Sequence, residues 1–461
     1  MSNLLDKIIA GGLMLAVVFT ALALGAVEAW SVALFELIIV ILLLLWAAKA
    51  VIEKRLEVII PSAAMPLAAF VLLGAIQSVA GSEGRISSLS MDVEATRGAT
   101  AVIFFLFVCF LIAASFFATR ERLRQLANFL IVFGLVLAVF ALVQHFTWEG
   151  RLFWFRPAPS AGASGPFVNR NHFAGYMEML IPIAVALALS RAARGEARLF
   201  YGFAAAIMGI AEAASLSRGG IVSLTAGLLF VAAVRLRMED PGSRTADRGE
   251  TDDRPPATGH RPPATNPLSS LLAPRSSLLL LLIGAAIIAG VFWVGADSGL
   301  AERLANSQDD PGPASRSAIW SGTLTMIRAH PVLGVGLGAF ETVYPIYGRG
   351  DGNKLIQFAH NDYLQVLADG GIVAAALAVW FIIVTFRGFV RGLKLRDPLL
   401  RALALGAGAG MFAILVHSLF DFNLQLPSNA LLFLVLVAMT TGDRRPITDD
   451  RRPGTEDGRP A

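Results

Sequence analysis

Three polar side chains set between long apolar stretches are the residues best able to do chemistry in this sequence. Arg218 belongs to the short sequence SRGG at residues 217–220, and Arg316 and His360 belong to a polar stretch at residues 315–367. Guanidinium groups bind phosphate through paired hydrogen bonds, and an imidazole can accept a proton near neutral pH. Together these side chains predict chemistry on an anionic substrate, with the arginines as ligands and the histidine as a base or a phosphate ligand.

Each arginine also has an ordinary structural explanation. Two glycines follow Arg218, so its guanidinium and the bare backbone N–H groups of a helix start can approach an anion. The same side chain could instead anchor a helix at lipid head groups. Arg316 lies four residues before Trp320 on an amphipathic pattern, which alone favours a surface arginine that meets lipid phosphate. Two guanidiniums on one face of a membrane, however, can hold a diphosphate and neutralise charge that develops as it leaves.

His360 lies in the sequence AHNDYL, at the predicted start of a helix. It could bind an anion there or take the proton of a hydroxyl group, with Asn361 and Asp362 beside it as substrate-binding residues. Alternatively, His360 or Asn361 only caps the helix while Asp362 complements its dipole. The residue pattern alone leaves both explanations open.

Two further polar clusters stand at the ends of apolar stretches. The first combines amides with basic side chains and comprises Asn169, Arg170, Asn171 and His172. Such groups suit sugar hydroxyls or phosphate, although helix capping is the simpler explanation. The second lies in HSLFDFNLQLP, where Asp421 and Asn423 follow His417 by about one helical turn. These residues either line a site or close a helix end.

Three carboxylates, Glu36, Glu178 and Glu212, fall within predicted membrane spans. Charged groups in the membrane are costly and by default indicate function. Glu212 precedes Arg218 by less than two helical turns, so an ion pair with that or another arginine is an expectation. Glu28, in the first external turn, is a rival general base.

Several classes of site are disfavoured. The sequence contains no GxxxxGK[ST] phosphate loop, no His/Cys metal-ligand spacing and no DxD pair in the predicted external loops. A metal-dependent sugar-nucleotide enzyme is therefore disfavoured, nucleic-acid binding has no support, and neither a metal site nor a cofactor is predicted. The single cysteine, Cys109, lies in an apolar stretch and can form no intramolecular disulfide.

The elements that position these residues are predicted to be membrane helices. Of the 461 residues, 56% are hydrophobic and 16% are charged, whereas soluble domains are about 25% charged. A helix needs about 20 apolar residues to cross a bilayer. The sequence therefore predicts an all-α integral membrane protein with about twelve spans, at roughly 8–27, 30–51, 58–80, 99–119, 126–146, 173–190, 199–216, 220–236, 277–295, 365–386, 399–420 and 427–441.

The basic residues orient these spans. With the N-terminus inside, the predicted cytoplasmic connections collect four groups: Lys49, Lys54 and Arg55; Arg120, Arg122 and Arg124; Arg191, Arg194 and Arg198; and Arg387, Arg391, Lys394, Arg396 and Arg401. This distribution obeys the positive-inside rule. The connections at 147–172, 217–220, 296–364 and 421–426 are therefore expected together on the external face, which is the periplasm in a bacterium with two membranes.

The predicted organisation has four parts. Residues 1–237 form eight spans and residues 276–441 form four more, with the external loop 296–364 between the first two of these. Residues 238–275 are Pro-rich and charged, repeat RPPAT, and are predicted to be a disordered cytoplasmic linker. The tail at 442–461 has the same character.

The external loop is predicted to be partly helical. One helical face from residue 316 to 327 carries five mainly apolar side chains: Ile319, Trp320, Thr323, Met326 and Ile327. This helix should lie along the membrane surface or pack onto the bundle. Pro331 ends it, and Gly334, Gly336 and Gly338 are expected to form a tight bend before His360.

Several motifs resemble the O-antigen ligase/polymerase family. They are SRGG, the R-x-x-x-W helix followed by HPVLGVGLGAF, AHNDYLQVLADGG, VNRNHFAGYMEMLIP and HSLFDFNLQLPSNALLF, and they cover about residues 165–440. The resemblance implies a GT-C-like fold and assigns the catalytic roles to Arg218, Arg316 and His360. The long insert at 238–275 departs from better-known ligases and leaves the acceptor undetermined.

The resemblance also implies a function. It is the inverting transfer of a glycan from undecaprenyl diphosphate to a sugar hydroxyl at the periplasmic face of the bacterial inner membrane, without metal or nucleotide. The acceptor would be lipid A–core for a ligase or a growing carrier-linked polysaccharide for a polymerase. A protein O-oligosaccharyltransferase uses the same donor chemistry. A transporter for ions or bicarbonate is an alternative from another class, because of the carboxylates in the spans, although no clear inverted repeat is present.

Overall fold

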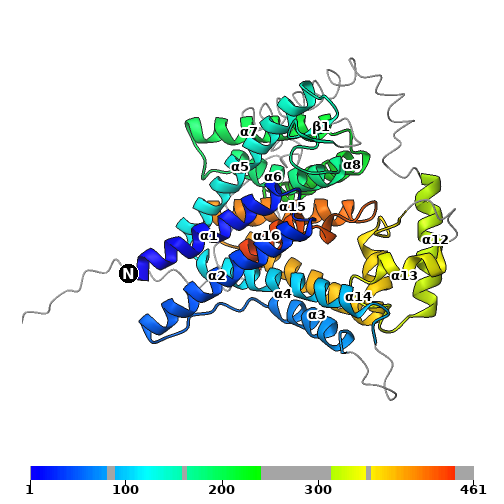
Figure 1. Ribbon diagram of the computed structural model, residues 1–461. Helices are drawn as coiled ribbons and strands as arrows, with labels where there is room; N and C mark the ends of the chain where they lie inside the picture. The colour runs from blue at the N-terminus through cyan, green and yellow to red at the C-terminus, as the bar shows by residue number, and fades with distance from the viewer. Residues whose placement is uncertain (1, 80–88, 158–162, 240–312, 349–354, 442–461) are drawn as a thin grey trace, which may run out of the picture.

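The computed structural model describes residues 2–79, 89–157, 163–239, 313–348 and 355–441. Long helices form a bundle, and the short helices α12 and α13 lie at one end of it, with α12 running across the direction of the long helices (Figure 1). The helices are α1 (Ser2–Leu22), α2 (Ala29–Glu53), α3 (Ala64–Gln77), α4 (Val93–Phe116), α5 (Arg120–Phe146), α6 (Arg170–Leu189), α7 (Gly195–Ala214), α8 (Arg218–Glu239), α12 (Pro313–Ala329), α13 (Phe340–Tyr347), α14 (Asp362–Leu393), α15 (Pro398–His417), the 3-10 turn η2 (Asn423–Gln425) and α16 (Pro427–Thr441).

Most predicted spans coincide with helices. Among the described residues nine helices are long and apolar enough to cross a membrane, and the shorter apolar helices α3 and α16 accompany them. These eleven helices match eleven of the twelve predicted spans, which confirms a mainly helical membrane protein. The predicted span at 277–295, the tail at 442–461 and all but residues 238 and 239 of the predicted linker lie outside the described residues; those two residues belong to α8. The total span count and the GT-C class stay predictions.

One element was not predicted. Strands β1 (Arg151–Leu152) and β2 (Arg156–Pro157) pair antiparallel in the connection between α5 and α6. Each strand is two residues long, which is too short for an alternating apolar pattern to predict it.

Helices α6 and α15 form the centre of the bundle. The span of α6 is 100% buried and that of α15 is 78% buried within the protein. Their axes approach closely because Gly406 and Gly410 of α15 lie against the backbone of α6 at Ile183 and Met179. Small residues of this kind are what allow membrane helices to pack backbone to backbone. The pairing also brings the start of α6 beside the end of α15.

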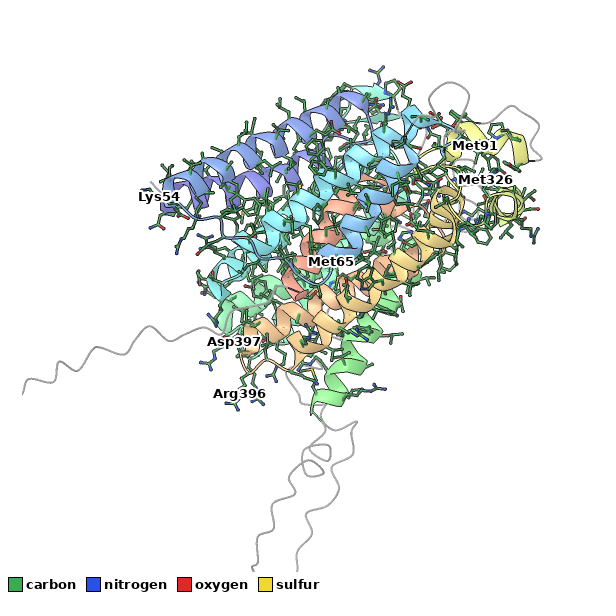
Figure 2. The ribbon with its side chains drawn as sticks, turned by 90° about the horizontal axis from the view of Figure 1, so that it is seen from below. Lys54, Met65, Met91, Met326, Arg396 and Asp397 are labelled. Carbon is green, nitrogen blue, oxygen red and sulfur yellow. The ribbon has the colours of Figure 1, made fainter. Side chains whose placement is uncertain are left out.

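The predicted cytoplasmic connections gather at one end of the bundle. Asp6 forms ion pairs with Lys49 at 3.3 Å and with Arg122 at 2.8 Å, and Asp397 pairs with Arg120 at 2.7 Å. Figure 2 shows Lys54, Arg396 and Asp397 toward this end and Met91 and Met326 toward the other. The structure therefore groups the basic connections as the sequence predicted. Which compartment each end faces stays a prediction.

Helix α14 is broken near its start. Gly371 has φ 61° and ψ −158°, which interrupts the helical hydrogen bonding. The segment after α12 supplies replacements, since Ile372 donates to the Pro331 carbonyl at 2.9 Å and Val335 donates to the Ala368 carbonyl at 2.9 Å. Non-helical backbone in a membrane protein needs such internal partners. The break therefore fixes the residue 331–338 loop against α14.

The predicted glycine bend is confirmed in this loop. Gly334, Gly336 and Gly338 have φ values of 66°, 117° and 76°, which side-chain-bearing residues rarely adopt. Gln77 of α3 reaches into the bend, donating to the Leu333 carbonyl at 2.7 Å and accepting from the Leu337 N–H at 3.1 Å. The bend is thus attached both to α14 and to α3.

Helix α12 packs onto this assembly through its predicted apolar face. Ile319, Thr323 and Met326 are buried, and Trp320 and Ile327 are partly buried against the same cluster. The cluster includes side chains of α13 and α14. The amphipathic pattern allowed this helix either to lie along the membrane surface or to pack onto the bundle. The structure shows that it packs onto the protein.

Candidate functional site

Three helix N-termini meet the segment that follows α15. Asp362 at the start of α14 donates its backbone N–H to the Ser418 carbonyl at 2.9 Å. Asn171 at the start of α6 donates to Asp421 at 2.7 Å, and Gly219 at the start of α8 lies against the His417 ring. Helix N-termini carry partial positive charge and favour anions. The arrangement therefore concentrates positive potential at the end of the bundle where the predicted site residues lie.

His360 is oriented by a buried carboxylate. Its Nδ1 lies 3.3 Å from Oδ1 of Asp421, and the two side chains are 18% and 1% exposed. Oδ1 of Asp421 also accepts from the Phe422 N–H at 2.9 Å, while Oδ2 accepts from Asn171. A hydrogen on Nδ1 that is donated to the carboxylate leaves Nε2 with a free lone pair. His360 is therefore arranged as a proton acceptor at Nε2.

The surroundings keep Asp421 ionised. Burial by itself raises the pKa of this carboxyl group. The hydrogen bond with His360 and favourable electrostatic interactions with three nearby imidazole rings outweigh burial and lower the pKa well below its ordinary value. An ionised carboxylate can then stabilise positive charge on His360 when that ring takes up a proton.

The start of α14 differs from the prediction. The helix begins at Asp362 and is capped by Asn361, whose Oδ1 accepts from the Tyr363 and Leu364 N–H groups, each at 3.0 Å. His360 therefore precedes the helix instead of opening it, and its φ of 49° lies in the left-handed region. This backbone turn directs the imidazole away from the helix axis and toward Asp421.

The neighbours of His360 hold the turn after α15. Asn361 donates to the Leu419 carbonyl at 3.0 Å. Asp362 accepts from Ser418 at 2.7 Å and from Gln425 at 3.1 Å. Both residues are buried, so the polar atoms predicted for substrate binding are engaged within the protein.

The cluster at the start of α6 lies on the other side of Asp421. Asn169 caps the helix by accepting the Asn171 N–H at 2.8 Å, and Arg170 is the first helical residue. His172 is buried with its Nδ1 3.1 Å from Asn423.

An aromatic ring joins this cluster to His360. The ring centroid of Phe422 lies 4.8 Å from that of His172 and 4.9 Å from that of His360. Phe358 stacks on Phe422 with centroids 4.4 Å apart. The α6 cluster and His360 are therefore parts of one packed assembly.

Arg218 occupies the first position of α8. The prediction placed it in a turn, but the turn lies earlier, at residues 215–217, and Ser217 caps the helix by accepting the Gly220 N–H at 3.1 Å. The Arg218 side chain is exposed. Since Gly219 lies against His417, Arg218 stands at the same end of the bundle as His360.

Arg316 lies on α12, the helix that contacts the segment before His360. It lies in the first turn of the helix and is partly buried. One turn later, the Trp320 indole N–H donates to the Ala359 carbonyl at 2.9 Å, and the Ala359 N–H donates to Gln365 of α14 at 2.8 Å. Both backbone groups of the residue before His360 are thus held, one of them by the helix that carries Arg316.

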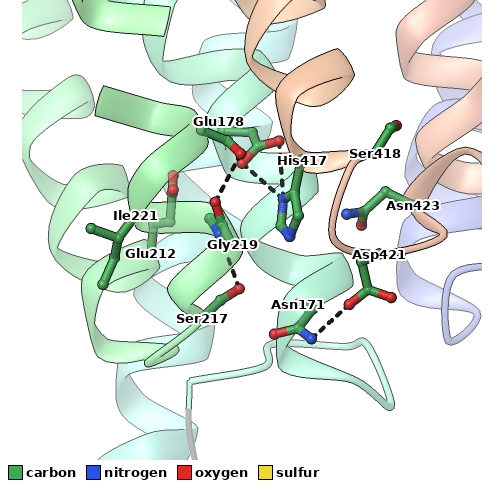
Figure 3. Close-up of polar contacts among 12 residues, drawn as sticks. Asn171, Glu178, Glu212, Ser217, Gly219, Ile221, His417, Ser418, Asp421 and Asn423 are labelled. Carbon is green, nitrogen blue, oxygen red and sulfur yellow. Dashed lines mark hydrogen bonds and ion pairs between the residues drawn. The ribbon is translucent and has the colours of Figure 1, made fainter. Parts of the chain in front are cut away.

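The carboxylates in the spans have separate environments. Glu178 contacts Nδ1 of His417 at 3.0 Å, and both side chains are buried in the centre of the bundle (Figure 3). The expectation that Glu212 pairs with an arginine is wrong within the described residues, where both its buried carboxylate oxygens lack a hydrogen-bond partner. Glu28, the rival candidate for the general base, forms an ion pair with Arg156 at 2.6 Å. Glu36 lies on α2 and is partly buried.

Two polar residues that support the segment before His360 were not predicted from the sequence. Gln365, which holds the Ala359 N–H, and Asp369, which accepts from Gln365 at 3.1 Å, lie four residues apart on α14. Their spacing places them on one face of an otherwise apolar span, a signal that could have marked a buried polar network. In the part of the chain that the structure describes, no group of three or more His, Cys, Asp or Glu side chains has metal-binding geometry.

The Asp421 environment predicts how stability depends on pH. The pKa is lower in the folded protein than the value of about 3.9 in an unfolded chain. The carboxylate therefore stabilises the fold above that pH, and this contribution is lost as the pH falls below about 4. We expect the difference in melting temperature between the native protein and Asp421→Asn to shrink as the pH falls below about 4. A difference that does not shrink below that pH contradicts the ionised state.

The Trp320 contact predicts a local change in backbone protection. In Trp320→Phe the Ala359 carbonyl loses its donor, at a cost of about 1 kcal/mol. We expect amides of residues 355–364 to exchange about fivefold faster in hydrogen–deuterium exchange mass spectrometry. Leu324→Ala, on the exposed face of the same helix, is the control and should leave that exchange unchanged. Equal exchange in both variants means that Trp320 does not hold this segment.

Comparison with known proteins agrees with the motifs. Residues 203–379 match the family model described as O-antigen ligase. A comparison with curated proteins found no match. The matched range begins in α7 and ends in α14, so it contains Arg218, Arg316 and His360. The resemblance seen in the sequence is thereby confirmed: residues 203–379 are similar to the O-antigen ligase family.

Proposed function

We propose that this protein is a metal-independent, inverting glycosyltransferase that moves a glycan from undecaprenyl diphosphate to a sugar hydroxyl in the assembly of a surface polysaccharide. The observation that carries the proposal is the contact of His360 with the buried carboxylate of Asp421. It supplies an oriented base beside a region of positive potential. The similarity of residues 203–379 to the O-antigen ligase family supports the same class of reaction.

In this mechanism His360 is the general base. Its Nε2 accepts the proton of the acceptor hydroxyl while the hydroxyl oxygen bonds to the anomeric carbon. The Asp421 carboxylate stabilises the resulting imidazolium and holds the ring in place, as a carboxylate does for histidine in other acyl- and group-transfer enzymes. The proton then passes from His360 to solvent, and the dyad returns to its starting state.

The arginines act on the leaving group. As the new bond forms, the bond between the anomeric carbon and the diphosphate oxygen breaks, and negative charge moves to the diphosphate. Arg218 and Arg316 bind this group and stabilise that charge, together with the N-termini of α6, α8 and α14. A single displacement of this kind inverts the anomeric centre and requires no metal ion or nucleotide.

The remaining predicted residues position the substrates. Asn169 and Arg170 at the start of α6 are proposed to contact sugar or phosphate oxygens. Asn171 acts through Asp421, to which it is bonded, and His172 acts through Phe422. Asn361 and Asp362 shape the turn around the base. The site is proposed to face the periplasm from the inner membrane.

Purified protein with defined substrates tests the proposal directly. It is incubated with an undecaprenyl-diphosphate glycan, a chelator, and one of two acceptors, lipid A–core or a second carrier-linked glycan. Product on the first acceptor identifies a ligase, and product on the second identifies a polymerase. A peptide acceptor rich in serine and threonine tests the protein O-oligosaccharyltransferase alternative. Absence of product with every acceptor, and of carrier release, contradicts the proposal; activity only without chelator contradicts metal independence.

Replacing one arginine tests the diphosphate contact. Lysine keeps the charge of Arg316 but loses the forked pair of donors. We expect Arg316→Lys to lower kcat/KM for the lipid-linked donor by about 100-fold. Arg328→Lys is the matched control, because Arg328 is exposed in the last turn of the same helix, and it should retain near-native transfer. Near-native transfer by Arg316→Lys removes this role from Arg316.

One observation favours a second candidate, a transporter. Glu178, His417 and Glu212 are buried in the bundle, and such groups often form ion or proton pathways. Flux of protons, sodium ions or bicarbonate into proteoliposomes, lost in Glu212→Gln, would support this function. Glycan transfer without flux would exclude it.

A further inference from the structure

His417 lies between the two halves of the proposed site, with Gly219 on one side and Asp421 on the other (Figure 3). Its Nδ1 contacts both oxygens of Glu178, at 3.2 Å and 3.0 Å. The two side chains are 1% and 0% exposed, so neither can touch a substrate in this structure. A buried ion pair is weak support for stability but strongly specifies geometry when both partners are present.

The ring of His417 packs closely against Gly219 at the start of α8. A Cβ atom at Gly219 would lie 2.7 Å from Nε2 and 2.8 Å from Cδ2 of His417, closer than non-bonded atoms approach. The imidazole cannot swing away without leaving Glu178. A Cβ atom at Gly220 would lie 2.7 Å from that of Ala174 on α6. The two glycines after Arg218 are therefore close-packing positions that seat the start of α8 against α15 and α6.

The backbone of His417 supports the other half of the site. Its carbonyl accepts the Phe420 N–H at 2.8 Å and the Asp421 N–H at 3.1 Å. These bonds form the turn that carries Asp421, the partner of His360. His417 thus contacts Gly219, the neighbour of the proposed diphosphate ligand, through its ring, and the backbone N–H of Asp421 through its own carbonyl.

We propose that His417, held by Glu178, is a positioning residue that sets Arg218 relative to the His360–Asp421 dyad. The inference rests on the proposed function, since it assigns Arg218 to the diphosphate and His360 to the acceptor hydroxyl. It also explains the first glycine after the arginine in SRGG: Gly219 leaves room for the His417 ring, which fixes the position of Arg218 at the start of α8. A misplacement of about 1 Å at such a ligand is enough to cost about 100-fold in rate.

The test is to introduce Gly219→Ala into two backgrounds, the native protein and a variant in which the pair is removed by Glu178→Gln and His417→Ala together. Removing both partners avoids leaving a single buried charge. In the native background we expect Gly219→Ala to lower kcat/KM for the lipid-linked donor at least tenfold, mainly through KM. In the pair-deleted background the added methyl group meets no ring, and the further loss should be under twofold. An equal loss in both backgrounds overturns the inference.

A labelling experiment separates this inference from the proposed function. The only cysteine, Cys109, is replaced by serine, and Arg218→Cys is labelled with a membrane-impermeant maleimide. Gly219→Ala should change the labelling rate several-fold in the native background and leave it unchanged in the pair-deleted one. If labelling changes in this way but the native protein transfers no glycan, the proposed function is refuted while the packing role of His417 stands. If labelling is unchanged in both backgrounds, the inference is refuted.

Melting temperatures in detergent check that each variant folds. If the pair-deleted variant does not fold, His417→Asn replaces it, because this shorter side chain also clears the space beside Gly219. The same comparison then applies. A loss from Gly219→Ala that is undiminished beside His417→Asn again overturns the inference.

Discussion

An ionised carboxylate inside a membrane protein is the feature on which the site depends. Asp421 is 1% exposed, and its charge persists only because His360, Asn171 and the Phe422 N–H surround it. Burial of an unpaired charge would cost several kcal/mol. The partners come from three separate elements, the start of α6, the segment before α14 and the turn after α15. Satisfying one carboxylate therefore draws together the residues that could bind and activate a substrate.

The surrounding architecture follows from the same constraint on polar groups. Backbone that leaves the helical conformation must find hydrogen bonds within the protein. The break at Gly371 finds them in the 331–338 loop, and this loop fixes α12 beside the chain that precedes His360. Trp320 and Gln365 then hold both backbone groups of Ala359. The helix that carries Arg316 and the segment that ends in His360 are in this way joined by direct hydrogen bonding.

Local patterns predicted the parts of this structure that local interactions determine. The eleven apolar spans that fall in the described residues, the buried face of α12 and the bend at Gly334, Gly336 and Gly338 follow from periodicity and backbone freedom, and the structure contains them. Pairings between distant elements could not be predicted in this way. His360 and Asp421 are 61 residues apart, and His417 meets Glu178 across 239 residues. Periodicity identifies a buried face but does not tell which helix covers it, and the arginine expected beside Glu212 is not found among the described residues. The left-handed backbone conformation of His360 could not be predicted either, because it accompanies a contact with Asp421, which is distant in the sequence.

The central claim is that the guanidinium groups of Arg218 and Arg316 and the imidazole of His360 act on one lipid-borne diphosphate sugar. A cryo-EM structure of the protein in a lipid nanodisc with undecaprenyl diphosphate tests it most directly. The account predicts density for the diphosphate within hydrogen-bond distance of both guanidiniums, at the end of the bundle where α6, α8 and α14 begin, with Nε2 of His360 facing the terminal phosphate. A diphosphate bound at the opposite end, beside Asp6 and Asp397, or one that contacts neither arginine, would contradict it.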